Sequence, residues 1–195
     1  MASQQSAHRI AGLEALLKEQ AGVRLPPVER WNPPYCGDIG LAIRADGTWL
    51  YQGSPIGRKP LVKLFARVLR RDEDGRHYLV TPVEKVDVVV ADAPFLAVEM
   101  EVAGRGREQL LTFRTNVDDV VRCDRDHPLE FIPEPHSGGL KPYLLVRGRL
   151  EALVTRALYY DLVELAHETD NRLGLWSGGA FFPLVRALSA AGNLR

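Results

Sequence analysis

The feature of this sequence that most constrains its fold is a succession of six short β-type runs between His77 and Ile132. Turn residues separate the runs, as at Gly104-Arg105-Gly106. The runs are HYLVTPVE, KVDVVVAD, FLAVEMEV, QLLTFRT, VVRC and LEFI. Consecutive short strands joined by tight turns are typical of a mostly antiparallel sheet or a partly closed barrel, and this is the architecture that we predict for the second half of the chain.

The segments ahead of these runs predict an α+β arrangement. Apolar residues recur at helical spacing from Ile10 to Leu17, which predicts an amphipathic helix. LPPVERWNPPYCG, at positions 25–37, carries four prolines and predicts an extended connector. Asp46-Gly47 then separates two alternating segments, 39–43 and 49–51, and predicts a β-hairpin with a two-residue turn.

A second helix is predicted to begin at Pro60, where the missing N–H of proline costs nothing. Leu61, Leu64, Phe65 and Val68 form one apolar stripe through PLVKLFARVLRR, and the turn-forming residues 72–75 end the helix. We therefore predict two small domains. Residues 1–85 form an N-terminal α+β domain with a helix, a hairpin, a helix and a strand. Residues 86–195 form a β-rich domain with one long helix.

The long C-terminal helix and its preceding strand are predicted within PYLLVRGRLEALVTRALYYDLVELAHE. Tyr143 to Val146 has strand character, and apolar residues from Leu150 to Leu162 recur at helical spacing. A shift of 94 positions aligns this segment with TWLYQGSPIGRKPLVKLFARVLRR, so that each copy consists of strand, turn and helix. The alignment indicates a duplicated motif. Chance similarity between two strand-to-helix units is the alternative.

The charge and cysteine content restrict the environment and the partners of the protein. Lys and Arg together number 25 and Asp and Glu together number 25, so no net charge attracts the chain to nucleic acid or to a lipid surface. The two cysteines are 87 positions apart and form no CxxC pattern, which predicts neither a disulfide framework nor a zinc site. No segment has the pattern of a secretory signal or a membrane helix. We expect a cytoplasmic, soluble protein without membrane insertion, metal or cofactor.

The segment GSPIGRKP, at positions 53–60, combines glycines, prolines and two adjacent cations, Arg58 and Lys59. It is not a nucleotide-binding P-loop, because its glycines are one residue too close and Pro60 replaces the Ser or Thr that would hold magnesium. Cations at the start of a helix are disfavoured by its partial positive charge, so a negative group is expected beside them. That group is either a bound anion or an internal carboxylate, such as Asp38, Asp46 or Glu84.

Other polar residues near strand ends are weaker candidates for a site. Glu84 follows Pro82 in a predicted edge or bulge, where a solvated glutamate is the alternative. Arg114, Thr115 and Asn116 close another strand, and the alternative for Asn116 is a turn cap. Cys36 has no base in a linear pattern and is interpreted as a structural thiol. Residues 124–127 are interpreted as a turn rather than a metal site.

WNPPYCGDIG, DGTWLYQGSPIGRKPLVKLF, YLVTPVEKV, DAPF, FRTN and HPLEF resemble the bacterial family catalogued as domain of unknown function 1285. The resemblance implies two α+β parts with a duplicated motif, and a second half superficially similar to pleckstrin-homology-like folds. It also implies a ligand pocket where the halves meet and a role in signal transduction. The polar residues in the matching strings are Asp38, Asp46, Arg58, Lys59, Glu84, Lys85, Arg114, Thr115 and Asn116, with Trp31 and Trp49 as walls.

From these observations we predict a binding or regulatory module whose partner is a small anionic ligand or a peptide. The predicted ligand-binding residues are Arg58, Lys59, Asp38, Trp49, Glu84, Arg114 and Asn116. One alternative is an enzyme with Glu84 or Asp38 as general base and Arg58 as the orienting group. Another is a protein-interaction scaffold that uses free strand edges. The oligomeric state does not follow from the sequence.

Overall fold

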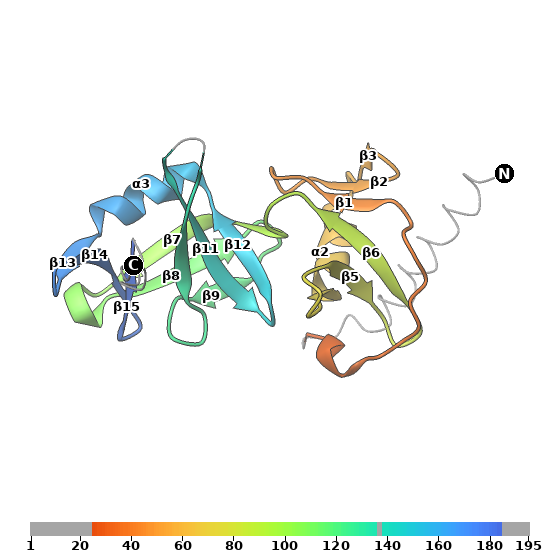
Figure 1. The fold of residues 1–195 in the computed structure, drawn as a ribbon, viewed down its shortest axis with the longest axis horizontal. Coiled ribbons are helices and arrows are strands. Elements are labelled where there is room, and N and C mark those ends of the chain that lie inside the picture. Colours follow the sequence, from red (N-terminus) through yellow and green to blue (C-terminus); the bar gives the residue numbers. More distant parts are fainter. Residues whose placement is uncertain (1–24, 136–137, 185–195) are drawn as a thin grey trace, which may run out of the picture. The chain divides into compact units, whose positions relative to one another are not determined.

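The computed structural model describes residues 25–135 and 138–184, so the helix predicted from Ile10 to Leu17 lies outside the described residues. The chain forms two compact units. Among the described residues, the first unit contains 25–96 together with 116–119 and 146–151, and the second contains the remainder. Within the described residues strands predominate, and the two α-helices, α2 and α3, are short (Figure 1).

The first unit is built on a six-stranded mixed sheet with the order β3-β2-β1-β6-β5-β4. Its elements are the 3-10 turn η1 (Val28–Arg30), β1 (Leu41–Ile43), β2 (Trp49–Tyr51), β3 (Ser54–Pro55), α2 (Lys59–Arg67), β4 (Leu69–Arg71), β5 (His77–Val80) and β6 (Lys85–Val90). Neighbouring strands are antiparallel except β1 and β6, which are parallel. The sheet extends through β6 to Val90. The domain boundary after residue 85 stays a prediction.

The β1–β2 hairpin is present, but its turn differs from the prediction. Ile43 pairs with Trp49, and Arg44 N–H donates to Thr48 O over 2.9 Å, which leaves the three residues 45–47 as the loop. Only Gly47 of these has a positive φ, of 79°. A two-residue primed turn needs positive φ at its central residues, whereas a type I turn followed by a left-handed glycine needs it only at the glycine. The turn is therefore of the second type.

Helix α2 ends earlier than its apolar pattern predicted. It ends at Arg67, and Leu69–Arg71 forms β4, which pairs with β5. The continuation of the helix to the turn at residues 72–75 is therefore wrong. Leu69 and Arg70 are adjacent and both buried, at 1% and 8% exposure. Over three residues an apolar pattern fits a helix and a strand alike, and the pairing of this segment with β5 makes it a strand.

The core of the first unit lies between this sheet and α2. Phe65 of α2 is completely buried and packs against Trp49 of β2, with ring centroids 6.2 Å apart. The surrounding core side chains are Leu41, Ile43, Leu61, Val68, Leu69 and Leu79. The predicted stripe of α2 is confirmed at Leu61 and Phe65, while Leu64 is half-buried. This packing positions the loop at residues 52–58 at the start of α2.

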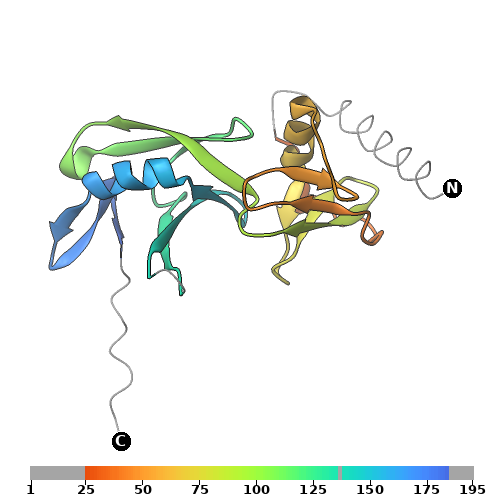
Figure 2. The ribbon, with the colours of Figure 1, turned by 90° about the horizontal axis from the view of Figure 1, so that it is seen from above.

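The second sheet has the order β10-β11-β12-β7-β8-β9. Its strands are β7 (Phe95–Ala103), β8 (Leu110–Thr115), β9 (Val120–Arg122), β10 (Leu129–Pro133), β11 (Leu140–Arg147) and β12 (Leu150–Val154), with the 3-10 turn η2 (Gly106–Glu108) between β7 and β8. A register shift between Ala97 and Glu99 interrupts the β7–β8 ladder. The sheet curls into a half-barrel (Figure 2). All six predicted β-runs are strands, of which the first two belong to the first sheet.

The long C-terminal helix predicted from Leu150 is wrong in its first half. Residues Leu150–Val154 form β12, and the helix α3 spans only Arg156–Glu164. Leu150, Ala152 and Val154 are buried and the residues between them are half-buried, which is the two-residue period of a strand. The apolar residues at 150, 153 and 154 also fit a helix, so the two periods overlap over this short segment.

The second unit ends with a separate three-stranded meander, β13 (His167–Thr169), β14 (Arg172–Ser177) and β15 (Ala180–Pro183). A hairpin, a helix and a three-stranded meander therefore occur twice, as β1-β2, α2, β4-β5-β6 and as β11-β12, α3, β13-β14-β15. In this order β2 corresponds to β12, whereas the shift of 94 positions had aligned it with β11. No described helix is long and apolar enough to cross a bilayer.

Candidate functional site

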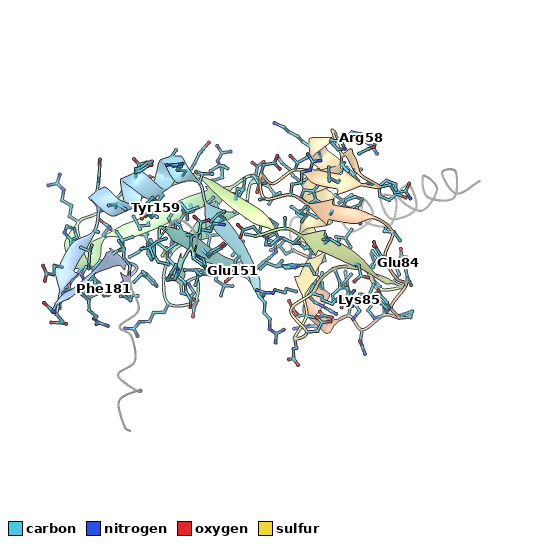
Figure 3. All side chains as sticks on the ribbon, turned by 45° about the horizontal axis from the view of Figure 1, so that its top comes forward. Arg58, Glu84, Lys85, Glu151, Tyr159 and Phe181 are labelled. Atoms are coloured by element: carbon cyan, nitrogen blue, oxygen red, sulfur yellow. The ribbon has the colours of Figure 1, made fainter. Side chains whose placement is uncertain are left out.

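The residues predicted around the start of α2 lie on its surface. Arg58 is the N-cap residue, Lys59 follows it, and both side chains are exposed. Figure 3 shows Arg58 well apart from Glu84 and Lys85. Arg58 has interactions within the structure, so it is not an isolated cation. The anion site at Arg58 stays a prediction, as does the enzyme that would use Arg58 with Glu84 or Asp38.

The carboxylates proposed as partners of Arg58 have local roles in turns. Asp38 accepts a hydrogen bond from Gly40 N over 2.7 Å, and Asp46 accepts one from Thr48 N over 2.9 Å. The bonds from Thr48 lower the pKa of Asp46. Glu84 lies in the turn between β5 and β6, where its backbone N–H donates to Thr81 Oγ1 over 3.1 Å. These two-residue and three-residue bonds are typical of turn residues.

Trp49, Arg114 and Asn116 are engaged in packing and pairing. Trp49 is 1% exposed in the core of the first unit. Arg114 of β8 forms a double hydrogen bond with Glu99, the residue opposite it on β7. Asn116 accepts a bond from Leu96 N over 3.0 Å through its side chain, and its own N–H donates to Leu96 O over 2.9 Å. The Asn116 amide lies so close to Gly47 that a Cβ there would be 2.7 Å from Nδ2.

Lys85 belongs to a charged cluster beside the proline-rich connector. Its ammonium lies 3.0 Å from Asp72 Oδ2 and 4.4 Å from the centre of the Tyr78 ring. Tyr78 donates to Asp74 over 2.6 Å. Burial and this hydrogen bond raise the pKa of Tyr78 to about 12. The connector itself is held by Lys85, whose backbone exchanges bonds with Pro34 O and Cys36 N. Lys85 therefore fixes the connector to the sheet through its backbone, while its side chain belongs to the charged cluster.

A polar pocket of about 430 Å³ in the first unit is lined by Asp38, Arg76, His77 and Asp87 and by the end of β6. Asp87 is 6% exposed, pairs with Arg76 over 2.5 Å and accepts a hydrogen bond from Tyr35. Arg76 and Asp87 thus neutralise each other at this pocket. A ligand would have to compete with these short, charge-assisted bonds.

The lowered pKa of His77 makes the stability of the folded chain depend on pH. Burial, together with Arg71 directly opposite it on β4, lowers the pKa of His77 from 6.5 to about 4. Between pH 6.5 and 4 the unfolded chain takes up a proton at His77 and the folded chain does not, so stability falls across this window. Because the ring is only partly buried, the loss at pH 4 should be of the order of 1 kcal/mol. Urea unfolding is measured for the wild type and His77→Gln at pH 7, 5.5 and 4. Relative to the variant, the free energy of unfolding of the wild type should fall by this amount as the pH is lowered. Parallel profiles would contradict this assignment.

A second pocket, of about 380 Å³, lies wholly in the second unit and forms the candidate functional site. It is bounded by η2, by the end of α3, by β13 and by β14. The residues that line it are Arg105, Gly106, Arg107, Gln109, Glu164, Leu165, His167 and Trp176. Its volume is in the range of small-molecule sites, and it combines one aromatic ring with several polar groups.

Buried hydrogen bonds hold η2 against β14 and so shape this pocket. Gln109 is 2% exposed, and its Nε2 donates to Trp176 O over 2.8 Å. Gly178 N donates to Gln109 O over 3.0 Å. Ser177 accepts from Leu111 N over 2.9 Å and donates to Cys123 O over 2.6 Å. Because buried amide and hydroxyl groups are costly to leave unpaired, these bonds define the separation of the two walls.

The electrostatic character of the pocket is set by two arginines. The Arg107 guanidinium carbon lies 5.1 Å from the centre of the Trp176 ring, which is a cation–π geometry. Trp176 is also supported by Phe181, with ring centroids 5.3 Å apart, and its Nε1 donates to Thr169 Oγ1 over 3.4 Å. Across residues 25–135 and 138–184, neither Arg105 nor Arg107 forms an ion pair. Glu164 is the acidic residue of the lining, so the arginines outnumber the carboxylates there.

Sequence reasoning missed this pocket. Gly104-Arg105-Gly106 was interpreted only as a turn, although together with Arg107 it combines glycines and cations as GSPIGRKP does. A signal was therefore present in the sequence. The residues that complete the pocket, His167 and Trp176, are about sixty to seventy positions away along the chain, and no local pattern connects them to Arg107.

The fold and the pocket together define a two-unit, predominantly β protein with a small cationic pocket in its second unit. Residues 26–93 match the N-terminal domain of a family described as a domain of unknown function, DUF1285, and residues 94–184 match its C-terminal domain. The chain belongs to the DUF1285 family. No curated protein matches it.

Two solved structures carry the same family name. A DUF1285 family protein from Silicibacter pomeroyi DSS-3 is 48% identical, with a TM-score of 0.79, over 87% of this chain and 93% of that one. A DUF1285 family protein from Shewanella baltica OS155 is 31% identical, with a TM-score of 0.51, over 64% of this chain and 91% of that one. The family resemblance of the sequence is thus confirmed. The similarity of the second half to pleckstrin-homology-like folds, and the pocket where the halves meet, stay predictions.

Proposed function

We propose that this protein is a regulatory module that binds a small anionic molecule in the pocket formed by η2, α3, β13 and β14. The observation that carries the proposal is the pair Arg105 and Arg107, two cations that line a pocket of about 380 Å³ and have no ion-pair partner among the described residues. A guanidinium recognises carboxylate and phosphate oxygens through parallel N–H donors. Trp176 and Leu165 offer apolar contact for the rest of the ligand.

The physical basis of the proposal is the difference between this pocket and the one in the first unit. In the first unit, Arg76 is already neutralised by the buried carboxylate of Asp87. In the second, Arg107 is held by an aromatic ring, which orients the guanidinium without consuming its charge. Buried Gln109 and Ser177 keep the surrounding backbone in place. A site with prearranged cations loses little conformational entropy when an anion binds.

A thermal-shift screen of the full chain against nucleotides, sugar phosphates, carboxylates and acyl compounds tests the proposal. A ligand at a hundredfold excess over its dissociation constant stabilises the native state by about 2.7 kcal/mol. Arg107→Ala should weaken a stabilising anion about 10-fold to 100-fold, as expected when one charge-assisted pair is lost. Arg122→Ala is the matched control, because Arg122 is an exposed arginine of the same unit outside the pocket.

The variant Arg58→Ala distinguishes anion binding beside Arg107 from anion binding at the start of α2, the site predicted from the sequence. If the anion binds beside Arg107, Arg58→Ala keeps the full thermal shift. If Arg58→Ala abolishes the shift and Arg107→Ala does not, the anion binds at the start of α2 and the proposal is wrong. A screen in which no anion stabilises the wild type would also count against it.

A further inference from the structure

A separate pocket of about 410 Å³ lies at the beginning of α3. Its walls are the beginning of β11, the end of β12 and the first turns of α3, on which Figure 3 labels Tyr159. The apolar part of the lining comprises Leu140, Pro142, Leu153, Val154, Tyr159 and Tyr160. It shares no residue with the pocket of Arg105 and Arg107, which lies at the end of the helix.

The apolar side chains of this pocket are incompletely covered. Tyr160 is 54% exposed, and Leu140, Leu153 and Tyr159 are half-buried. Tyr159 and Tyr160 contact each other edge to face, with ring centroids 5.9 Å apart. Partly exposed leucines and tyrosines around one hollow are an apolar surface that a ligand body can remove from water.

One cation stands at this apolar pocket without a counter-charge. Arg156 Nε donates to Tyr160 Oη over 3.1 Å, and its guanidinium carbon lies 6.0 Å from the centre of the same ring. The other charged residues of the lining, Lys141 and Glu134, form an ion pair, with 3.3 Å between Lys141 Nζ and Glu134 Oε1. Within the described part of the chain Arg156 forms no ion pair. The tyrosine hydroxyl engages Nε and leaves the two terminal nitrogens of the guanidinium as donors.

We propose that this pocket is a second binding site, for a small amphipathic anion such as a medium-chain carboxylate. The apolar chain of the ligand packs against Leu140, Leu153 and Tyr159, and its carboxylate receives the terminal N–H groups of Arg156. The net charge of the lining, one uncompensated cation, matches a monoanion. The assignment does not depend on the function proposed above, because the two pockets have different walls and different arginines.

Titration of the full chain with decanoate and with decan-1-ol tests this site. Calorimetry gives the affinity of each probe, and amide shifts in heteronuclear NMR spectra locate it. We expect decanoate to bind saturably, with shifts centred on residues 140–142 and 153–160. Arg156→Gln should weaken decanoate at least 10-fold and leave decan-1-ol unchanged, because only the carboxylate contacts the guanidinium. Arg156→Lys, which keeps the positive charge, should recover part of the decanoate affinity.

Three results would overturn the assignment. The first is the absence of saturable decanoate binding below its micellar concentration. The second is equal decanoate affinity in the wild type and Arg156→Gln, with an unchanged unfolding midpoint in both. The third is loss of decanoate binding in Arg107→Ala, which would place the probe in the other pocket. Arg122→Ala serves as the neutral comparison, since this exposed arginine lines neither pocket.

Discussion

Replacement of Arg70 by alanine is expected to lower the free energy of unfolding by about 3–5 kcal/mol, the usual cost of breaking a buried ion pair from one side. The Arg70 side chain is 9% exposed and that of Asp72 is 21% exposed. The Arg70 guanidinium donates two hydrogen bonds to the Asp72 carboxylate, over 2.5 and 3.2 Å. It donates two more to the backbone carbonyls of Val28 and Trp31, over 2.7 and 2.8 Å. The substitution leaves these acceptors without their donors, and only Lys85 still pairs with Asp72.

The same substitution should loosen the proline-rich connector, because Val28 and Trp31 belong to it. Urea unfolding followed by far-UV circular dichroism measures the stability, and amide exchange at residues 28–37 measures the connector. Arg71→Ala is the matched control. Its side chain is 37% exposed and lies 3.6 Å from Glu151, so its removal should cost no more than about 1 kcal/mol. Equal losses for the two neighbours would contradict the role assigned to Arg70.

Replacement of Trp49 by alanine should cost about 3–5 kcal/mol, because the cavity left by a buried indole cannot collapse completely. Trp49 is 1% exposed, and its Nε1 is the one buried side-chain nitrogen or oxygen of the described residues that has no hydrogen-bond partner. Phenylalanine removes this unpaired donor and keeps the contact with Phe65. We therefore expect Trp49→Phe to lie within about 1 kcal/mol of the wild type, since losing an unsatisfied buried polar group offsets part of the lost apolar area.

Urea unfolding curves of the two variants provide the measurement, with circular dichroism as the signal because tryptophan fluorescence itself changes. Phe65→Leu is a useful comparison, since it alters the same contact from α2 without changing a polar atom. If Trp49→Phe proves as damaging as Trp49→Ala, the indole N–H has a partner, such as a bound water, and the physical account of this position is wrong.

Elements defined by neighbouring residues were predicted well. The β1–β2 hairpin follows from alternation around Asp46-Gly47, and the six β-runs follow from short apolar segments between turn residues. Two segments were misassigned for one reason. Residues 69–71 and 150–154 each directly adjoin a helix, and over three to five residues an apolar pattern fits both a helical and a strand period. Residues 69–71 are a strand because they pair with β5, and residues 150–154 are a strand because they lie between β11 and β7 in the second sheet. The apolar pattern within each segment contains neither fact.

The candidate site was less predictable than the fold. Arg58 and Arg107 both follow glycines in short loops, so local sequence does not rank them. The structure leaves Arg58 on the surface at the start of α2, and it brings His167 and Trp176 to Arg107. Conversely, Arg114 looked available in sequence, and its partner Glu99 is the residue opposite it across the β7–β8 ladder. The register of that ladder includes an irregularity between Ala97 and Glu99, which no pattern in the sequence indicates.

The sequence by itself determined the family, the predominance of short strands and the hairpin at Asp46-Gly47, because turn chemistry and side-chain alternation act between residues close together in the chain. Only the tertiary structure decided that β6 lies parallel to β1, that Arg70 is buried beside Asp72 and the connector, and that Arg107 and Arg156 stand at pockets without an ion-pair partner among the described residues. These outcomes depend on which distant segments exclude water from one another. Burial and charge compensation are properties of the packed chain, so they cannot be obtained from any single segment.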